Sequence, residues 1–302
     1  MPVLAETCLE LCRPRPGQVM LDATLGRGGH ASLFIPHLAG GAYVGLDLDA
    51  GNLAYAGERL APIAAAHGVT LVLRHASFAQ APGVLEGLEL PTLPGVPGVP
   101  GVLLADLGFA SNQVDDPGRG LSFAADGPLD MRLDTSAGVT AAELVNQLPE
   151  ADLADLLFGL GEEKLSRRIA RKIVETRQKQ PINTTAALAD LVRQAYGPAA
   201  RRQRIDPATR TFMALRIAVN DELGALERLI ETLPRIVAEG GRAAIISFHS
   251  LEDRRVKQGF AALAQTDGWR LVTRKPLTAS TSETARNPRS RSAKLRVIER
   301  AG

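Results

Sequence analysis

The chain has 302 residues, of which 45% are hydrophobic and 23% are charged. This is the balance of a globular protein with enough apolar material for a large core, and it excludes a chain that is disordered throughout. No run of about 18 apolar residues is present, so we expect no membrane anchor and no signal peptide. The length allows one large domain or two of ordinary size.

Charge is distributed unevenly along the chain. The net charge at pH 7 is only +2, yet residues 162–216 carry +8 and residues 270–302 carry +7, which leaves −13 for the rest. This asymmetry indicates that one face meets a polyanion, although solvated helix faces would produce the same count. The only cysteines, Cys8 and Cys12, have the spacing of buried thiols on a helix, which is typical of a reducing compartment. We therefore expect a cytoplasmic protein.

Strand and helix patterns alternate in the first third of the chain. Helices are predicted at 3–11, 30–38 and 52–60, and compact apolar strands at 19–24, 42–47, 70–74 and 102–106. Apolar strands separated by helices predict a parallel sheet that is covered on both faces. The Pro/Gly-rich stretch 91–101 interrupts this order, and we expect it to be an extended surface loop.

The alternation stops after Asp106. Residues 111–140 are polar and rich in turn formers, and residues 141–197 show helical periodicity only. One long helix is predicted from about Thr209 to Val237, before a strand at 242–248 and closing strands around 272 and 294–298. This order predicts a discontinuous α/β domain at 1–112 and 208–302, with a helical domain inserted at 113–207.

A glycine-rich turn follows the first predicted strand, in the segment Asp22-Ala-Thr-Leu-Gly-Arg-Gly-Gly-His30. Glycines there let the backbone approach a ligand closely, and the following helix supplies unpaired N–H groups. The spacing Gly26-x-Gly28-x-x-Ala31, with Asp47 downstream, fits a relaxed dinucleotide motif, so a nicotinamide-dependent dehydrogenase is one alternative. The acid Asp22 favours S-adenosylmethionine instead, because its carboxylate would hold the methionine ammonium but repel a pyrophosphate.

Aspartates end three predicted strands, at Asp22, Asp47 and Asp106. Ligands of open α/β sheets lie outside the carboxyl ends of the strands. We therefore expect the three carboxylates to converge on one crevice.

Motifs along nearly the whole chain, in order, resemble the bacterial RsmH (MraW) family, which methylates N4 of a cytidine in the decoding centre of small-subunit ribosomal RNA. Besides the glycine-rich segment, these motifs are Asp106-Leu-Gly, Asp115-Asp-Pro-Gly-Arg-Gly-Leu-Ser-Phe123, Gly127-Pro-Leu-Asp-Met-Arg132, Gly161-Glu-Glu163, Pro207-Ala-Thr-Arg-Thr-Phe212, Ala214-Leu-Arg-Ile-Ala-Val-Asn-Asp-Glu-Leu223, Ser247-Phe-His-Ser-Leu-Glu-Asp-Arg254 and Asn287-Pro-Arg-Ser-Arg-Ser-Ala-Lys-Leu-Arg296.

The resemblance implies a class I S-adenosylmethionine-dependent methyltransferase, with a Rossmann-like, mostly parallel sheet and an inserted all-helical substrate domain that recognises RNA. The family's cofactor contacts fall on Gly28, Gly29, His30, Asp47, Phe78, Asp106 and Gln113. The glycine-rich turn adds Asp22 and Gly26 to this set. The sequence departs from the family around Gln113, where Phe109-Ala-Ser-Asn-Gln-Val114 replaces the usual Val-Ser-Ser-Pro-Gln-Leu.

Two residues are candidates for the reaction itself. The exocyclic amine of cytosine is a poor nucleophile, so the enzyme must position it and accept a proton. We expect Asp106 near the reacting centre and His249 beside the cytidine. His249 with Glu252 and Asp253 also suggests a metal site, but a capped helix start explains this trio better, and no metal is expected.

The resemblance names 16S ribosomal RNA, within the assembled small ribosomal subunit, as the partner. The basic segments would then hold RNA phosphates while an unpaired base enters the crevice. A second alternative is an RNA-binding or ribosome-assembly factor that has the fold but no turnover. The sequence leaves the oligomeric state open, with a homodimer as one alternative, and no membrane partner is expected.

Overall fold

The computed structural model describes residues 1–90 and 99–302. Two compact units divide the chain: unit 1 comprises Met1–Gly108 and Leu223–Gly302, and unit 2 comprises Phe109–Glu222. The sequence placed the boundaries at 112/113 and 207/208, whereas the second boundary of the structure falls 15 residues later. Most of the surface loop expected at 91–101 lies outside the described residues.

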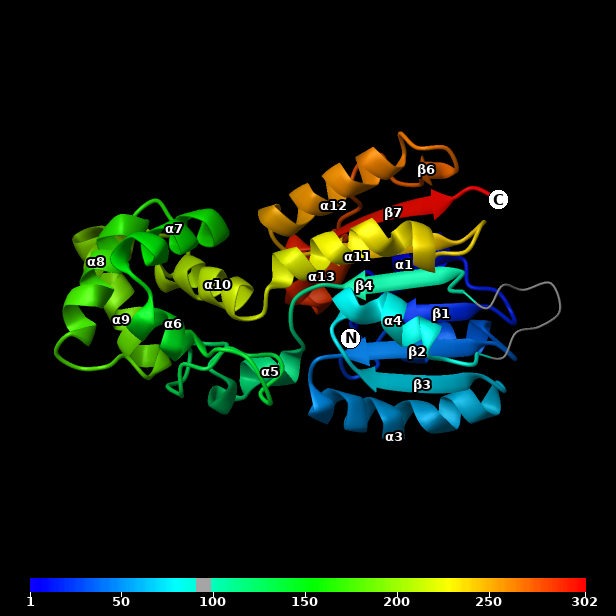
Figure 1. The fold of residues 1–302 in the computed structure, drawn as a ribbon, viewed down its shortest axis with the longest axis horizontal. Coiled ribbons are helices and arrows are strands. Elements are labelled where there is room, and N and C mark those ends of the chain that lie inside the picture. The colour runs from blue at the N-terminus through cyan, green and yellow to red at the C-terminus, as the bar shows by residue number, and fades with distance from the viewer. Residues whose placement is uncertain (91–98) are drawn as a thin grey trace. The chain divides into compact units, whose positions relative to one another are not determined.

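Unit 1 is built on a seven-stranded sheet with the order β3-β2-β1-β4-β5-β7-β6 (Figure 1). The strands are β1 (Val19–Asp22), β2 (Ala42–Asp47), β3 (Thr70–His75), β4 (Val102–Asp106), β5 (Arg242–Ser247), β6 (Trp269–Leu271) and β7 (Lys294–Arg300). Strands β1 to β5 are parallel to one another, and β7 runs antiparallel to both of its neighbours, β5 and β6. The predicted parallel sheet is therefore confirmed.

Helices cover both faces of this sheet because successive strand residues point to opposite sides. Met20 packs into one core with α1 (Ala5–Cys12), α2 (Ala31–Phe34) and α3 (Ala50–Ala66). Leu21 packs into the other core with α4 (Ala81–Glu86), α11 (Glu222–Ile236) and α12 (Ser250–Leu263). Short 3-10 turns η1 (Ile35–His37) and η2 (Phe78–Gln80) complete these layers, and α13 (Thr281–Arg286) and η5 (Pro288–Ser292) precede β7.

The two cysteines of α1 are buried and reduced, as expected. Burial raises the pKa of the Cys12 thiol to about 12, with Arg242 opposing the shift. Cys12 is therefore an uncharged, unreactive core residue at neutral pH.

Unit 2 is helical. It contains α5 (Ser111–Asp115), η3 (Pro117–Arg119), α6 (Ala141–Gln147), α7 (Glu150–Gly161), α8 (Ser166–Arg177), α9 (Thr185–Tyr196), η4 (Gly197–Arg202) and α10 (Ala208–Val219). Helices α7 and α10 cross closely, because a Cβ on Gly161 would lie 2.7 Å from the carbonyl oxygen of Arg210. The buried carboxylate of Glu163 accepts the Tyr196 hydroxyl at 2.8 Å and helps hold α9.

The prediction of one long helix over 209–237 is wrong. This stretch forms two helices, α10 and α11, which are separated at Asn220 and Asp221. Asp221 has a φ of +46°, the left-handed conformation that ends a helix and that short polar side chains adopt more readily than others. None of the described helices is long and apolar enough to cross a membrane.

Candidate functional site

The three strand-end aspartates lie at one edge of the unit 1 sheet. In the parallel register, Asp22 at the end of β1 lies opposite Gly45 of β2 and Leu104 of β4. The chains beyond the strands are tied together as well, because the amide of Asp106 donates to Oγ1 of Thr24 at 2.6 Å. The carboxyl ends of β1, β2 and β4 therefore form one continuous rim.

The glycine-rich turn closes over the end of β2. The amide of Gly26 donates to Oδ2 of Asp47 at 2.7 Å, and the amide of Asp49 donates to Oδ1 of the same carboxylate at 2.8 Å. Gly28 has a φ of +72°, and a Cβ there would lie 3.0 Å from Leu60. Glycine is thus required at Gly28 for both conformation and space. Burial raises the pKa of Asp47, although its hydrogen bonds oppose the shift.

Asp22 points into the protein. Only 2% of the residue is exposed, and its oxygens accept the Tyr43 hydroxyl at 2.6 Å and the Thr24 amide at 3.1 Å. Burial raises its pKa to about 6 despite these hydrogen bonds. The contact with a methionine ammonium stays a prediction, and the partners that the structure gives this carboxylate are internal.

His30 and Asp106 face each other at the rim, with Nε2 of His30 3.4 Å from Oδ2 of Asp106. Burial lowers the pKa of His30, but contact with Asp106 and the charges of Asp106 and Asp22 outweigh it, so the pKa is raised overall. Oδ1 of Asp106 and Nδ1 of His30 are buried and lack a hydrogen-bond partner among the described residues. Buried polar atoms are seldom left unbonded, so this pair has the character of a site that accepts a polar ligand.

The remaining predicted site residues lie in three further places. Phe78 is half-buried and opens η2 after β3. His249 begins α12 after β5, with Nε2 3.1 Å from Oε1 of Glu252, so the capped helix start expected there is present. Gln113 belongs to unit 2, where it is buried in α5 and its Oε1 accepts the amide of Ala110 at 2.8 Å.

Two residues of this rim were not identified from the sequence. Tyr43 and Thr24 hold Asp22 and the Asp106 backbone, respectively. Tyr43 could have been identified because it carries a hydroxyl within the otherwise apolar strand 42–46. A buried Tyr hydroxyl needs a hydrogen-bond partner, which predicts a polar neighbour. Thr24 carried no such signal, since a Thr after a strand is common.

The rim fits a cofactor such as S-adenosylmethionine. Asp47 is a carboxylate at the end of β2, where ribose hydroxyls are commonly held, and the turn at 26–30 provides glycines and the unbonded His30 Nδ1. These donors and acceptors match the hydroxyl, amine and carboxylate groups of that molecule.

Comparisons with known proteins identify the family of the chain. The sequence profile described as the MraW methylase family matches residues 1–301. "Ribosomal RNA small subunit methyltransferase H" of Sorangium cellulosum is 49% identical over 99% of this chain and 90% of its own length, and that of Syntrophotalea carbinolica is 46% identical over 99% and 96%. A solved rRNA methylase from Streptococcus thermophilus aligns over 99% of this chain and 94% of its own at 9% identity, with a TM-score of 0.44.

The mostly parallel sheet, taken together with this family match, makes the protein a class I methyltransferase that uses S-adenosylmethionine. The chain belongs to the MraW methylase family. The dehydrogenase alternative is therefore wrong, and the relatives support methylation of ribosomal RNA.

Proposed function

We propose that this protein methylates N4 of a cytidine in the decoding centre, in the P-site region of 16S ribosomal RNA, within the assembled small subunit. The names of relatives that are 45–49% identical over at least 99% of this chain support the ribosomal substrate. The observation that carries the proposal within the structure is the unbonded Oδ1 of Asp106 at the rim, next to the end of β4. Such a reaction would take place in the cytoplasm.

We assign to Asp106 the role of accepting the proton that the amine loses. When bound, S-adenosylmethionine supplies an electrophilic sulfonium methyl group. As the N4–methyl bond forms and the methyl–sulfur bond breaks, the amine becomes positively charged and must lose a proton. The side chain of Asp106 is 24% exposed, and its Oδ2 lies 3.4 Å from Nε2 of His30, which leaves Oδ1 to accept that proton. His30 thus orients the acceptor carboxylate.

His249 is the residue that we assign to positioning the cytidine. It follows β5, the strand next to β4, and therefore lies at the same edge as Asp106. Glu252 accepts the amides of Phe248 and His249 at 2.7 and 3.2 Å, which fixes the start of α12. A residue on such a rigid helix start can hold a base in one orientation.

Unit 2 is proposed to recognise the RNA. Exposed arginines occur on α8 and around η4, at Arg167, Arg168, Arg171, Arg201, Arg202 and Arg204. Aromatic residues are only 4% of the chain, so phosphate contacts rather than base stacking should dominate. Binding should then weaken steeply between roughly 50 and 200 mM salt.

The test uses small subunits from a methylation-deficient strain, incubated with the protein and S-adenosylmethionine. Mass spectrometry of the nucleosides should show N4-methylcytidine. Asp106→Asn should slow turnover by about 10²–10⁴-fold while leaving a folded protein. His249→Ala with unchanged turnover would contradict its positioning role.

Two negative results are informative. Cofactor binding without any methylated nucleoside would favour an assembly factor with no turnover. Methylation at another position or base would retain the methyltransferase but replace the proposed substrate.

A further inference from the structure

The glycine-rich turn over residues 26–30 is a flexible piece of backbone that has to hold one shape. Gly26 and Gly28 have φ values of +52° and +72°, and glycine loses more conformational freedom on ordering than any other residue. The amide of Gly26 bonds Asp47, but that carboxylate is also the acceptor expected for the cofactor ribose. Contacts on the other side of the turn are therefore needed if it is to keep its shape before a cofactor binds.

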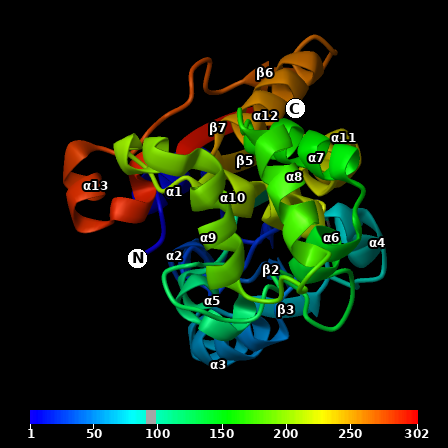
Figure 2. The ribbon, with the colours of Figure 1, turned by 90° about the vertical axis from the view of Figure 1, so that its left-hand side faces the viewer.

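Arg59 of α3 contacts the turn at two points. Its Nη1 donates to the carbonyl oxygen of Arg27 at 3.3 Å, and its Nη2 donates to Oγ of Ser32 in α2 at 3.2 Å. The Ser32 hydroxyl in turn donates to the carbonyl oxygen of Gly29 at 2.9 Å. Figure 2 shows α2 and α3 on the same side of β2 and β3, where they share one core. A single guanidinium thus ties Arg27 directly, and Gly29 through Ser32, to a long helix.

Tyr55, one turn earlier on α3, contacts the side chain of the same turn residue. The guanidinium carbon of Arg27 lies 3.5 Å from the centre of the Tyr55 ring. A guanidinium over an aromatic face is attracted by the negative charge of the π-system. Tyr55 and Arg59 are four residues apart, so they lie on the same face of the helix. One helix face therefore holds both the carbonyl oxygen and the side chain of Arg27.

These three residues lie on the surface. Arg27 and Arg59 are exposed, and 43% of Tyr55 is exposed. The core side of α3 consists instead of buried residues such as Ala56 and Leu60. Substitutions of exposed residues generally change global stability little. The contacts of Tyr55 and Arg59 therefore act mainly on the local shape of the turn rather than on the stability of unit 1.

We propose that Tyr55 and Arg59 are positioning residues for S-adenosylmethionine, which hold the glycine-rich turn in its binding conformation before the cofactor arrives. They act through Arg27 and Ser32 and not on the cofactor itself. Preformed loops bind more tightly because less conformational freedom is lost on binding. The inference rests on the assignment of the turn to the cofactor and does not depend on the RNA substrate.

The test measures the affinity for S-adenosylmethionine by calorimetry, with no RNA present. Arg59→Gln should weaken binding roughly five- to tenfold, because hydrogen bonds from a charged group to the turn are lost. Lys257→Gln is the matched control, since it removes the same charge from an exposed position on α12, which packs on the opposite face of the sheet. This control should keep the wild-type affinity.

Tyr55 is tested by a pair of variants. Tyr55→Leu removes the aromatic face and should weaken binding roughly two- to fivefold, whereas Tyr55→Phe keeps the face and should bind like the wild type. This rescue by phenylalanine distinguishes the contact with Arg27 from a general effect of altering α3.

Hydrogen exchange reports on the turn directly. The amides of Gly28 and Ser32 donate to the carbonyl oxygens of Leu25 and Gly28 at 3.0 and 3.1 Å. Without cofactor, both amides should exchange faster in Arg59→Gln than in the wild type, and saturating cofactor should abolish the difference. The amide of Leu25, which donates to the carbonyl oxygen of Leu46 at 2.8 Å, should keep its protection in every variant.

Equal affinities for Arg59→Gln and Lys257→Gln would overturn the inference, as would equal losses in Tyr55→Leu and Tyr55→Phe. Faster exchange at Leu25 as well as in the turn would indicate a general structural role and would also overturn it. A wild-type protein that does not bind S-adenosylmethionine would refute the assignment of the turn to the cofactor, and the inference with it. Methylation of RNA is not measured, so the inference and the proposed function can fail independently.

Discussion

The hydroxyl of Tyr43 donates a 2.6 Å hydrogen bond to Oδ2 of Asp22, and both side chains are buried. Since this bond stabilises the ionised carboxylate, Tyr43→Phe should raise the pKa of Asp22 further. The variant should lose about 1–3 kcal/mol of stability at neutral pH, the cost of a buried acceptor without its donor. Urea unfolding at pH 7.5 measures this, and a change below about 0.5 kcal/mol would contradict it.

Asp22 itself should make stability depend on pH. Its pKa is about 6 in the folded protein, above the ordinary value of 3.8 for an aspartate, so the folded state holds the proton more tightly. The contribution of Asp22 to stability is therefore most favourable below about pH 4, falls as the pH rises through about 6, and is about 3 kcal/mol less favourable at higher pH.

Asp22→Asn removes that deficit. The free energy of unfolding of the variant should rise relative to that of the wild type between pH 4.5 and 7, with no further rise at higher pH. Asp267→Asn, at an exposed position, is the control and should follow the wild type. Urea unfolding across this range gives the comparison, and a pH-independent difference would argue against the assignment.

His30 should affect stability at a higher pH than Asp22. Its pKa is raised above 6.5 in the folded protein, mainly because contact with Asp106 overcomes burial. The stabilisation is fully present below about pH 6.5 and is lost as the pH rises through the folded pKa. The stability difference between the wild type and His30→Asn should hence be larger at pH 6 than at pH 9. A titration of the ring by NMR would show the raised pKa directly.

Neighbouring glycines in the turn should tolerate alanine differently. Gly28→Ala forces a side chain into positive φ and against Leu60, and should cost about 1–2 kcal/mol or more. Gly29 has no positive φ, and its new methyl group would only touch Pro2 at 3.4 Å. Gly29→Ala should therefore unfold close to the wild type. Thermal unfolding of the two variants measures the difference. Equal losses of stability would contradict the expected difference between the two positions.

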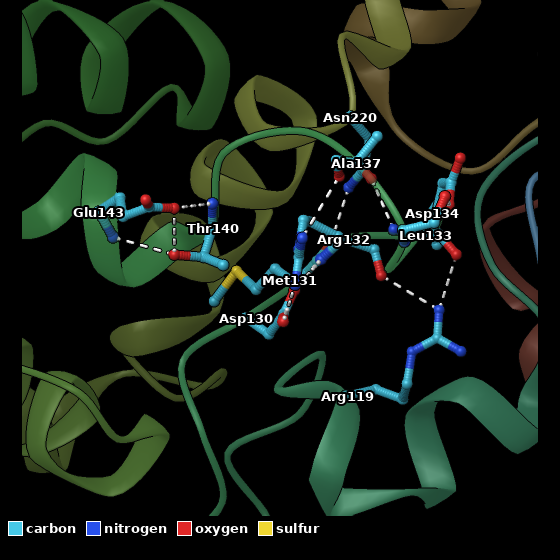
Figure 3. A network of polar contacts seen from close by, with 11 residues as sticks. Arg119, Asp130, Met131, Arg132, Leu133, Asp134, Ala137, Thr140, Glu143 and Asn220 are labelled. Atoms are coloured by element: carbon cyan, nitrogen blue, oxygen red, sulfur yellow. Dashed lines mark hydrogen bonds and ion pairs between the residues drawn. The ribbon is translucent and has the colours of Figure 1, made fainter.

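Asn220 clamps the loop that follows Met131 in unit 2 (Figure 3). Its Oδ1 accepts the amide of Leu133 at 2.7 Å, and its Nδ2 donates to the carbonyl oxygen of Met131 at 2.8 Å. Met131 has a φ of +67°, a strained conformation that needs such support.

Asn220→Ala should speed hydrogen exchange of the Leu133 amide by one to two orders of magnitude, since its partner is gone. The amide of Glu143, which donates to Oγ1 of Thr140 in the nearby capping box, is the internal control and should keep its protection. Unchanged exchange at Leu133 would show that the loop does not depend on this clamp.

The sheet was predictable because β1, β2 and β4 are continuous apolar runs that end in aspartates, and both features follow from burial on two faces. The helical unit was predictable from periodicity alone. The break between α10 and α11 was not, because no Pro or Gly marks it. At the break, Asn220 hydrogen-bonds residues almost 90 positions away, and such contacts are not visible in the local sequence.

The site was predictable in part for a similar reason. Strand ends place Asp22, Asp47 and Asp106 at one edge in any parallel sheet. Which carboxylate faces inward depends on a partner across the strand pair, and the Tyr43–Asp22 bond is such a tertiary contact. Gln113 is the first residue of the helical domain expected from the sequence, and the structure also has it in unit 2.

The insertion of unit 2 between β4 and β5 affects how the protein is made. Val102 of β4 pairs with Arg242 of β5, so about 140 residues must be synthesised before that partner exists. At about 5–20 residues per second, this takes roughly 7–28 s, during which β4 is an unpaired edge. Unit 2 is one continuous segment and can fold in that interval. A chaperone would therefore have most to protect in a nascent chain that has stalled before β5, because the edge of β4 is still unpaired.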